Sequence, residues 1–370
     1  MSQVGVMHLS DTLDPGGLER VSVTIANELP RGGYRVYLCT TRRDGVLARL
    51  VASHVGRLRL GRRGRFDVKA VRRLTAYIRQ HEIALLHAHG TALFIAAIAS
   101  LLVPGLKVIW HDHFGGHGIE KRPRFLYWMA ARRACGVIAV TEGLAEWSRR
   151  SLHVPPERVW CVPNFASEPG VDTSQLPDLP GTAGFRIACV ANLRPQKDHR
   201  NLVLAMRDVV NAVPEAHLLL LGGASDTVFA KSIEEEIKRS GLSSSISWLG
   251  PRDDVPSVLK SCEIGVLSSA SEGFPLALLE YGMAGLAVVA TRVGKCEEVL
   301  GNGSAGVLVP PSAPQALGGA IVSLLQSPER RRELGERLGK LVRENYSAER
   351  AISQVLRIYG SVLRPRDQTK

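Results

Sequence analysis

SEGFPLALLEYGMAGLAVVAT, residues 271–291, passes from a loop of small residues through a helical segment into the apolar run AVVAT. The same alternation of apolar runs and helical segments continues on both sides. The other apolar runs of this half are RIACVA, HLLLLG, SISWLG, IGVLS and AGVLVP. Because strands that are apolar throughout are typical of parallel sheets covered by helices on both faces, we predict an α/β fold here.

The N-terminal half follows the same pattern. Its apolar runs are VGVMHLS, YRVYLCT, IALLHAH, KVIWH and GVIAV, and residues 67–80 between two of them have helical apolar spacing. Residues 166–183 contain three prolines and no periodicity, which is typical of a linker. We therefore predict two Rossmann-like doubly wound domains facing a cleft, the first at 1–165 and the second at 184–346. A length of 370 residues suits two domains.

The positive charge is unevenly distributed. Residues 1–165 contain 24 Lys and Arg against 12 Asp and Glu, whereas residues 166–370 contain 23 of each, so the net charge of +12 belongs to the first half. We see no long uncharged apolar run and no signal peptide, and six scattered cysteines argue against disulfides and a structural zinc site. We therefore expect a cytoplasmic protein.

Loops at the carboxyl ends of parallel strands are where ligands bind in such sheets. Gly16 and Gly17, in the loop 11–21, would let a phosphate or sugar approach the start of a helix, although a simple turn explains them equally well. Arg194 and Lys197 lie where a strand gives way to a helix and could neutralise a diphosphate. The alternative is a solvated basic turn.

The opening stretch combines a helix start with two carboxylates. Pro275 suits the first position of a helix, which leaves the amides of Leu276 and Ala277 available to an anion. Glu272 could accept hydrogen bonds from sugar hydroxyls, and Glu280 could reach a ribose. Alternatively, Glu272 is a capping charge and Glu280 an exposed helix residue.

The same stretch resembles the Glu-x7-Glu signature of retaining GT-B glycosyltransferases of family four, also called group one. Further segments match that family in order: PGGLERV, LLHAHG, VIWHDHFG, VPN, VANLRPQKD, LLLLGG, ISWLGPRDDVPSVLKSCEIGVLSS and GVLVPP. The resemblance implies a nucleotide-sugar site in the C-terminal domain, an acceptor site in the N-terminal domain, and a terminal helix, residues 347–370, that packs back on the first domain. Domain closure would then hinge near residues 166–183 and 345–350.

The resemblance also implies roles for individual residues. Glu272 would bind the donor sugar and Glu280 the ribose, while Arg194 and Lys197 would contact the diphosphate. Ala191 and Asn192 stand where many relatives have Gly-Arg. The loop around the sugar and phosphate would be Gly273, Phe274, Pro275 and Leu276, and the turn from Leu249 to Arg252 would lie against the base.

Histidines gather on the acceptor side. The stretch WHDHFGGHG contains His111, His113 and His117, and His111, directly after the predicted strand, is the closest match to a family histidine beside the reacting sugar. His113 is the second candidate. The i,i+2 spacing in a glycine-rich loop does not favour a metal site, and GT-B enzymes generally need no divalent ion, so we expect no metal. His87 and His89 either line the acceptor side or have a structural role.

The expected reaction is sugar transfer with retention from a UDP-sugar or GDP-sugar, without a cofactor, in polysaccharide or glycolipid assembly. Two arginine-rich segments, 56–66 and 121–134, favour a polyprenyl-diphosphate-linked or sugar acceptor and peripheral binding to the anionic inner face of the cell membrane. Alternatively Leu126, Trp128 and Met129 belong to the core. We see no nucleic-acid-binding module. The competing functions are a GT-B nucleotide-sugar epimerase and a non-catalytic nucleotide-sugar-binding protein.

Overall fold

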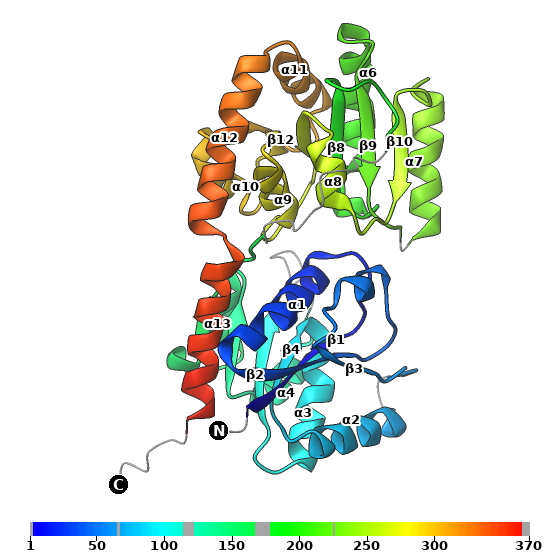
Figure 1. The fold of residues 1–370 in the computed structure, drawn as a ribbon. Coiled ribbons are helices and arrows are strands. Elements are labelled where there is room, and N and C mark those ends of the chain that lie inside the picture. Colours follow the sequence, from blue (N-terminus) through cyan, green and yellow to red (C-terminus); the bar gives the residue numbers. More distant parts are fainter. Residues whose placement is uncertain (1–2, 65–66, 114–121, 167–177, 225, 365–370) are drawn as a thin grey trace. The chain divides into compact units, whose positions relative to one another are not determined.

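The computed structural model describes residues 3–64, 67–113, 122–166, 178–224 and 226–364. Most of the predicted linker 166–183, residue His117 and the end of the predicted terminal segment 347–370 lie outside these residues. The polypeptide divides into two compact units (Figure 1). Unit 1 comprises Met1–Asn164 and Ala348–Lys370, and unit 2 comprises Phe165–Ser347.

Unit 1 contains a seven-stranded parallel sheet in the order β3-β2-β1-β4-β5-β6-β7. The strands are β1 (Val4–Ser10), β2 (Tyr34–Thr40), β3 (Gly56–Arg59), β4 (Ile83–His89), β5 (Lys107–Asp112), β6 (Gly136–Ala139) and β7 (Val159–Cys161). The helices are α1 (Gly17–Glu28), α2 (Val68–Gln80), α3 (Leu93–Leu102), α4 (Arg124–Ala131), α5 (Glu142–Ser151) and α13 (Ala348–Leu363).

Alternate residues of these strands point to opposite faces of the sheet. On one face, Met7, Ala88 and Trp110 pack with residues of α2, α3, α4 and α5 in a single apolar core. On the other face, α13 contacts α1 and carries Tyr359, which is fully buried. The second face is unusual because its central strands present histidines instead of aliphatic side chains.

Unit 2 contains a six-stranded parallel sheet in the order β10-β9-β8-β11-β12-β13. The strands are β8 (Arg186–Val190), β9 (His217–Leu221), β10 (Ile246–Gly250), β11 (Ile264–Leu267), β12 (Ala287–Thr291) and β13 (Val307–Val309). The helices are α6 (His199–Ala212), α7 (Thr227–Arg239), α8 (Val255–Lys260), α9 (Leu276–Ala284), α10 (Cys296–Val299), α11 (Pro314–Leu325) and α12 (Pro328–Asn345).

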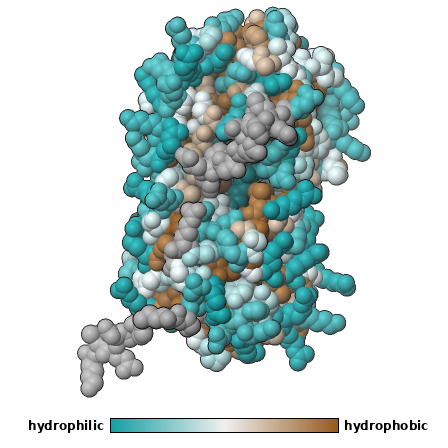
Figure 2. Space-filling view, in the orientation of Figure 1, coloured by the Kyte–Doolittle hydropathy of each residue, from teal (hydrophilic) through white to brown (hydrophobic). Residues whose placement is uncertain are grey.

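Both faces of the second sheet are covered, which explains its apolar strands. Ile187 and Cys189 face a core formed with α6, α7 and α11, whereas Ala188 faces a core formed with α8, α9, α10 and α12. The predicted α/β class with two Rossmann-like sheets is confirmed. The outer surface on the side shown in Figure 2 is largely hydrophilic, as expected when each sheet is covered by amphipathic helices.

Candidate functional site

The centre of the unit 2 sheet is a topological switch point. The neighbours β8 and β11 lie at the centre, and the polypeptide continues from β8 to β9 on one side and from β11 to β12 on the other. The loops that follow β8 and β11 therefore diverge to opposite faces of the sheet. A crevice at the carboxyl ends of such a strand pair is where open α/β sheets bind ligands. The loop after β8 carries Arg194 and Lys197, and the loop after β11 carries Glu272.

The two predicted site residues Lys197 and Glu272 are in direct contact. Lys197 Nζ lies 2.5 Å from Glu272 Oε1, and Ser269 Oγ donates a hydrogen bond of 2.6 Å to the same oxygen. The Lys197 side chain is 24% exposed and that of Glu272 only 8%. An ion pair with this little exposure is screened less by salt than a surface pair, so it holds both side chains in place.

Backbone contacts join the same two loops. The carbonyl of Gln196 accepts hydrogen bonds from the amides of Ala270 (2.9 Å) and Ser271 (3.3 Å). Ser268 Oγ donates to the carbonyl of Lys197 over 3.0 Å. Because both loops are fixed independently of the side-chain pair, Lys197 and Glu272 meet in a preformed arrangement. The sequence analysis missed the supporting residues Gln196, Ser268 and Ser269, although SSAS directly precedes Glu272.

A third loop, after β12, supports the backbone of Glu272. Gly294 has a φ of +53°, and a Cβ there would lie 2.3 Å from the carbonyl oxygen of Glu272. The amide of Lys295 donates to the carbonyl of Gly273 over 3.1 Å. The sequence analysis did not single out this loop, although VGK after the run AVVAT marks it as another strand-end turn.

The helix α9 begins one residue later than predicted. Pro275 is its N-cap, with extended backbone (φ −79°, ψ 101°), and Leu276 is the first helical residue. The prediction of Pro275 at the first helical position was wrong by one residue. The first amides of the helix still have no partner one turn earlier, as in any helix, so the shift of one residue does not conflict with the predicted anion site.

A buried tyrosine ties α9 to the sheet. Tyr281 Oη accepts a hydrogen bond from the amide of Val190 (2.8 Å) and donates one to the carbonyl of Val266 (3.0 Å). Gly265 makes room for its ring, because a Cβ at Gly265 would lie 2.4 Å from it. The preceding residue, Glu280, is partly buried. Tyr281 therefore fixes the position of Glu280 relative to the ends of β8 and β11.

The other predicted donor residues are less constrained. Arg194 is exposed at the start of a short 3-10 turn, Pro195–Lys197. Arg252, after β10, binds Asp254 through Nε (2.7 Å) and Nη2 (2.5 Å). This hydrogen bonding raises the pKa of Arg252 and lowers that of Asp254. A ligand near the turn Leu249–Arg252 would have to compete with Asp254 for the guanidinium.

The first loop of unit 1 is organised by a carboxylate that the sequence analysis overlooked. Asp11 accepts hydrogen bonds from the hydroxyls of Thr41 and Thr91 and from Arg62 Nη2 at 3.1 Å. Gly16 is the N-cap of α1 and Gly17 is its first residue. A Cβ at Gly16 would lie 2.3 Å from the Glu19 carboxylate, so this glycine gives Glu19 room against the helix start.

Two arginines of the predicted basic surface are structural. Arg62 is 8% exposed and binds Asp11, while Arg122 is 6% exposed and binds the fully buried Asp112 over 2.6 and 3.0 Å. The Arg122 guanidinium also lies over the rings of Tyr127 and Trp147. The assignment of these two arginines to a charged surface was wrong, because a count of charges does not reveal a buried carboxylate partner.

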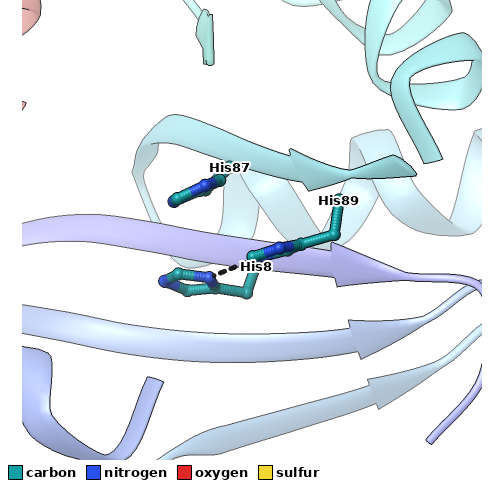
Figure 3. Close-up of side chains that lie close together, drawn as sticks. All are labelled: His8, His87 and His89. Atoms are coloured by element: carbon teal, nitrogen blue, oxygen red, sulfur yellow. Dashed lines mark hydrogen bonds between the residues drawn. The ribbon is translucent and has the colours of Figure 1, made fainter. Parts of the chain in front are cut away.

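Five histidines of unit 1 form a cluster of side chains on the α13 side of the sheet: His8, His87, His89, His111 and His113. His111 lies within β5, not directly after it as predicted, and His8, His87, His89 and His111 are all buried. His113 follows the strand and is partly buried. Figure 3 shows His87 and His89 on β4 beside His8 on β1. The sequence analysis missed His8, because only the strand register places it opposite His87.

Among the described residues, two groups of three histidines have nitrogens close enough to hold a metal ion. The groups are His8, His87 and His89, and His89, His111 and His113, with nitrogens within 4.8 Å of one another. Burial lowers the pKa of His8 and His113 to about 3. Burial also lowers the pKa of His87, His89 and His111 far below its usual value, and repulsion from neighbouring histidines lowers it further. The rings are therefore neutral at physiological pH.

We expect this cluster to make unit 1 acid-sensitive. Each histidine has a pKa of about 6.5 in the unfolded chain but stays neutral in the folded unit, so below that pH the unfolded state binds more protons. Above about pH 6.5 the histidines do not reduce the free energy of unfolding. Below that pH, they lower the free energy of unfolding by about 1.4 kcal/mol per histidine for each pH unit. Urea unfolding between pH 7.5 and 5 measures this slope. His8→Gln should make it shallower, and an unchanged slope would contradict the assignment.

Two family models match the polypeptide. The model for glycosyl transferases group 1 matches residues 181–340, and the model for glycosyltransferase family 4 matches residues 15–174. The first match contains all six strands of the unit 2 sheet, and the second contains β2 to β7 of the unit 1 sheet. Strand β1 and helix α13 lie outside both matches.

Several proteins with curated names also match the polypeptide in sequence. The polypeptide is 31% identical over 175 residues to N-acetyl-alpha-D-glucosaminyl L-malate synthase of Bacillus anthracis, covering 47% of this chain and 45% of that protein. It is 29% identical over 215 residues to the lipopolysaccharide core biosynthesis mannosyltransferase LpcC of Rhizobium leguminosarum bv. viciae, covering 58% and 57%. The chain spans about half the length of the curated relatives it matches.

Solved structures share the fold over nearly the whole length. HepE of Anabaena in complex with UDP and glucose superposes with a TM-score of 0.80 at 20% identity, covering 97% of this chain and 100% of that one. Sucrose-phosphate synthase from Thermosynechococcus elongatus gives 0.79 at 19% identity, covering 97% and 99%. At these identities the likeness shows the GT-B fold.

Proposed function

Because the polypeptide belongs to the group 1 glycosyltransferases of GT-B fold, we propose that it moves a sugar from a nucleotide-diphosphate sugar to a sugar or lipid-linked acceptor, with retention at the anomeric carbon. The pathway we propose is cell-surface polysaccharide or glycolipid assembly. The observation that supports this best is the contact of Lys197 with Glu272 between the loops that follow β8 and β11.

In the proposed donor complex, the cation and the carboxylate act on different parts of the donor. Lys197, with Arg194, neutralises the diphosphate, which also contacts the first amides of α9. Glu272 Oε1 already accepts from Lys197 and Ser269, so we assign Oε2 as the acceptor of a sugar hydroxyl. Glu280 binds the ribose. The remaining donor contacts we propose are Gly273, Phe274, Pro275 and Leu276 around the sugar and phosphate, and Leu249 and Arg252 at the base.

The proposed reaction is a front-face displacement. The bond from the anomeric carbon to the diphosphate oxygen breaks, a bond to the acceptor oxygen forms on the same face, and the acceptor proton passes to the leaving diphosphate. Lys197 stabilises the charge that develops on the leaving group. We assign to His111 the positioning of the sugar, and to Gly16 and Gly17 the close approach of a substrate. We propose that no metal or cofactor takes part.

A thermal-shift screen tests the donor proposal. UDP-, GDP- and ADP-sugars are compared at equal concentration, because a ligand that binds only the folded state raises the melting temperature. We expect a UDP-sugar or GDP-sugar to stabilise the wild type and to lose this effect in Glu280→Ala. Val228→Ala, on the exposed start of α7, is the matched control. If no nucleotide sugar shifts the melting temperature, the proposal fails.

The acceptor proposal includes a membrane surface on unit 1. Phe125 (64%), Leu126 (40%) and Met129 (45%) are exposed on α4, which contradicts the alternative that places Leu126 and Met129 in the core. Arg124 and Arg132 flank them and are also exposed. Leu101 (63%) and Leu102 (49%) are also exposed, at the end of α3, a helix that contacts α4. No described helix is both long and apolar enough to span a bilayer.

Apolar side chains between cations suit the interface of an anionic bilayer, because the rings enter the headgroup layer while the arginines pair with phosphates. We expect vesicles with anionic lipid to retain the protein at low salt and to release it at high salt. Phe125→Ser with Met129→Ser should abolish retention in a cosedimentation assay. Val228→Ser, which removes a side chain 77% exposed in unit 2, should not. Equal retention of the double variant would contradict the assignment of α4.

A further inference from the structure

The donor loop is defined here as residues 268–275, which lead from β11 to α9 and include Glu272. The residue Phe274 in this loop is only 8% exposed and belongs to the apolar core formed with α8, α9, α10 and α12. A ring buried in this way is not available to a sugar or a nucleotide. Phe274 therefore anchors the loop through its side chain, and the donor contact that we propose for it involves its backbone.

The ring of Phe274 contacts the ring of Tyr346. The two ring centroids lie 5.3 Å apart with an interplanar angle of 66°, which is an edge-to-face arrangement. Such a ring pair stabilises a structure by more than the burial of its surface alone. Tyr346 is the C-cap of α12 and is itself partly buried. The donor loop is thus attached to the end of a helix that lies far from it in sequence.

The helices on either side of this contact are also packed closely together. Helix α9 begins where the donor loop ends, and it lies directly on α12. Glycines permit this approach: a Cβ at Gly335 would lie 2.1 Å from the carbonyl oxygen of Gly285, and a Cβ at Gly282 would lie 2.7 Å from Val342. Because α12 has a fixed position on α9, Tyr346 at its end is held against the donor loop.

Tyr346 also joins the two segments in which the polypeptide passes between the units. These passages come after Asn164 and after Ser347. The carbonyl of Tyr346 accepts a hydrogen bond of 3.1 Å from the amide of Ala166, and Ala166 and Ser347 form a parallel β-bridge. The two passages are therefore hydrogen-bonded to each other at the residue whose ring holds the donor loop.

We propose that Tyr346 is a positioning residue for the donor loop, an inference that rests on the donor site proposed above. Its ring holds Phe274, and through Phe274 it holds the backbone that carries Glu272. Its carbonyl holds Ala166. The donor loop and the bridge between the passages therefore become ordered together, so a nucleotide sugar that binds the loop also stabilises the bridge. Tyr346 does this without touching the donor.

Amide hydrogen exchange of Ala166, followed by NMR, tests the link in the absence of any ligand. The amide exchanges when its hydrogen bond to Tyr346 opens, so its rate measures the stability of the bridge. We expect Tyr346→Leu to speed this exchange by about 2–10-fold, because it removes an edge-to-face ring pair. Phe274→Leu should have a similar effect. In the double variant the two increases should not multiply, since both substitutions remove the same contact.

Kinetics with the donor selected by the thermal-shift screen test the positioning role. A loop that is less often ordered binds its ligand more weakly, so we expect Tyr346→Leu to raise KM for the donor by about 2–10-fold. The kcat should not change, because a bound donor orders the loop. Loss of folded enzyme would instead lower kcat at constant KM. In the wild type, a saturating donor should slow the exchange of Ala166 by the same factor.

Tyr346→Phe keeps the ring and should restore both wild-type readouts, because none of the described residues forms a hydrogen bond with the Tyr346 hydroxyl. Tyr77→Leu is the matched control. Tyr77 is a partly buried tyrosine of α2 in unit 1, and its ring lies 5.8 Å from that of Tyr37 at an angle of 85°. Its loss should change neither the exchange of Ala166 nor KM.

Three results would overturn the inference: unchanged exchange of Ala166 in Tyr346→Leu, increases that multiply in the double variant, or a fall in kcat at unchanged KM. If the exchange of Ala166 responds as expected but the wild type uses no nucleotide sugar, the proposed function fails, and the link between Phe274, Tyr346 and Ala166 stands.

Discussion

Lys197→Ala is expected to lower kcat by about 10²–10³-fold while the protein stays folded, because it removes the cation that stabilises the leaving diphosphate. Turnover with the donor identified by the thermal-shift screen measures this. Lys260→Ala, at the exposed end of α8, is the matched control and should keep wild-type kcat.

The variant Glu272→Gln tests whether turnover needs the negative charge of Glu272 or only a side chain of its size in the loop. Glutamine keeps the size of the side chain but cannot form the ion pair with Lys197, and we expect its kcat to fall by orders of magnitude as well. Because both side chains act on one donor, we expect the double variant Lys197→Ala with Glu272→Gln to lower kcat by a smaller factor than the product of the two single-variant factors. Near-wild-type kcat in Lys197→Ala or in Glu272→Gln would remove that residue from the site, and fully independent losses would show that the pair does not act as one unit.

Arg122→Met is expected to destabilise unit 1 by about 3–5 kcal/mol, because it leaves the Asp112 carboxylate buried without its cation. The Asp112 side chain is completely buried and that of Arg122 is 6% exposed, so water cannot replace the lost partner. Urea unfolding followed by tryptophan fluorescence measures the change, since Arg122 packs on Trp147 in the same unit.

Arg150→Met provides the comparison for the buried pair. Arg150 is 81% exposed and pairs with Glu146 one turn earlier on α5, an arrangement worth about 0.3–0.5 kcal/mol. Arg122→Met with Asp112→Asn should recover part of the loss, because the charge is no longer buried. A loss in Arg122→Met no larger than that in Arg150→Met would contradict the structural role of the pair.

The sequence was sufficient for the fold class and for placing Lys197 and Glu272 on loops that follow strands. Apolar strands alternating with amphipathic helices encode a covered parallel sheet, and burial on both faces of β8 and β11 follows directly from that pattern. Lys197 and Glu272 were predicted from two separate strand-end loops, and the structure brings them into contact. Strand ends predict such residues well because parallel strands end at the same edge of a sheet.

What the sequence could not predict depends on contacts between distant segments. His8 and Tyr359 are 351 residues apart, and only the register of β1 and the packing of α13 bring them together. Arg62 and Arg122 looked like surface charge because their partners, Asp11 and Asp112, are remote or hidden in a strand. The loop of Gly294 was overlooked because its function is to leave space for the Glu272 backbone, which no local pattern reveals.

Proton NMR of the product tests the central claim, retaining sugar transfer, most directly. The wild type is incubated with the nucleotide sugar selected by the thermal-shift screen and a polyprenyl-diphosphate-linked sugar, and the anomeric proton of the new linkage is recorded as it forms. We predict that the new linkage has the same anomeric configuration as the donor. With Lys197→Ala, we predict no signal from the anomeric proton of a new linkage. A product of inverted configuration, or an epimerised nucleotide sugar with no new linkage, would contradict it.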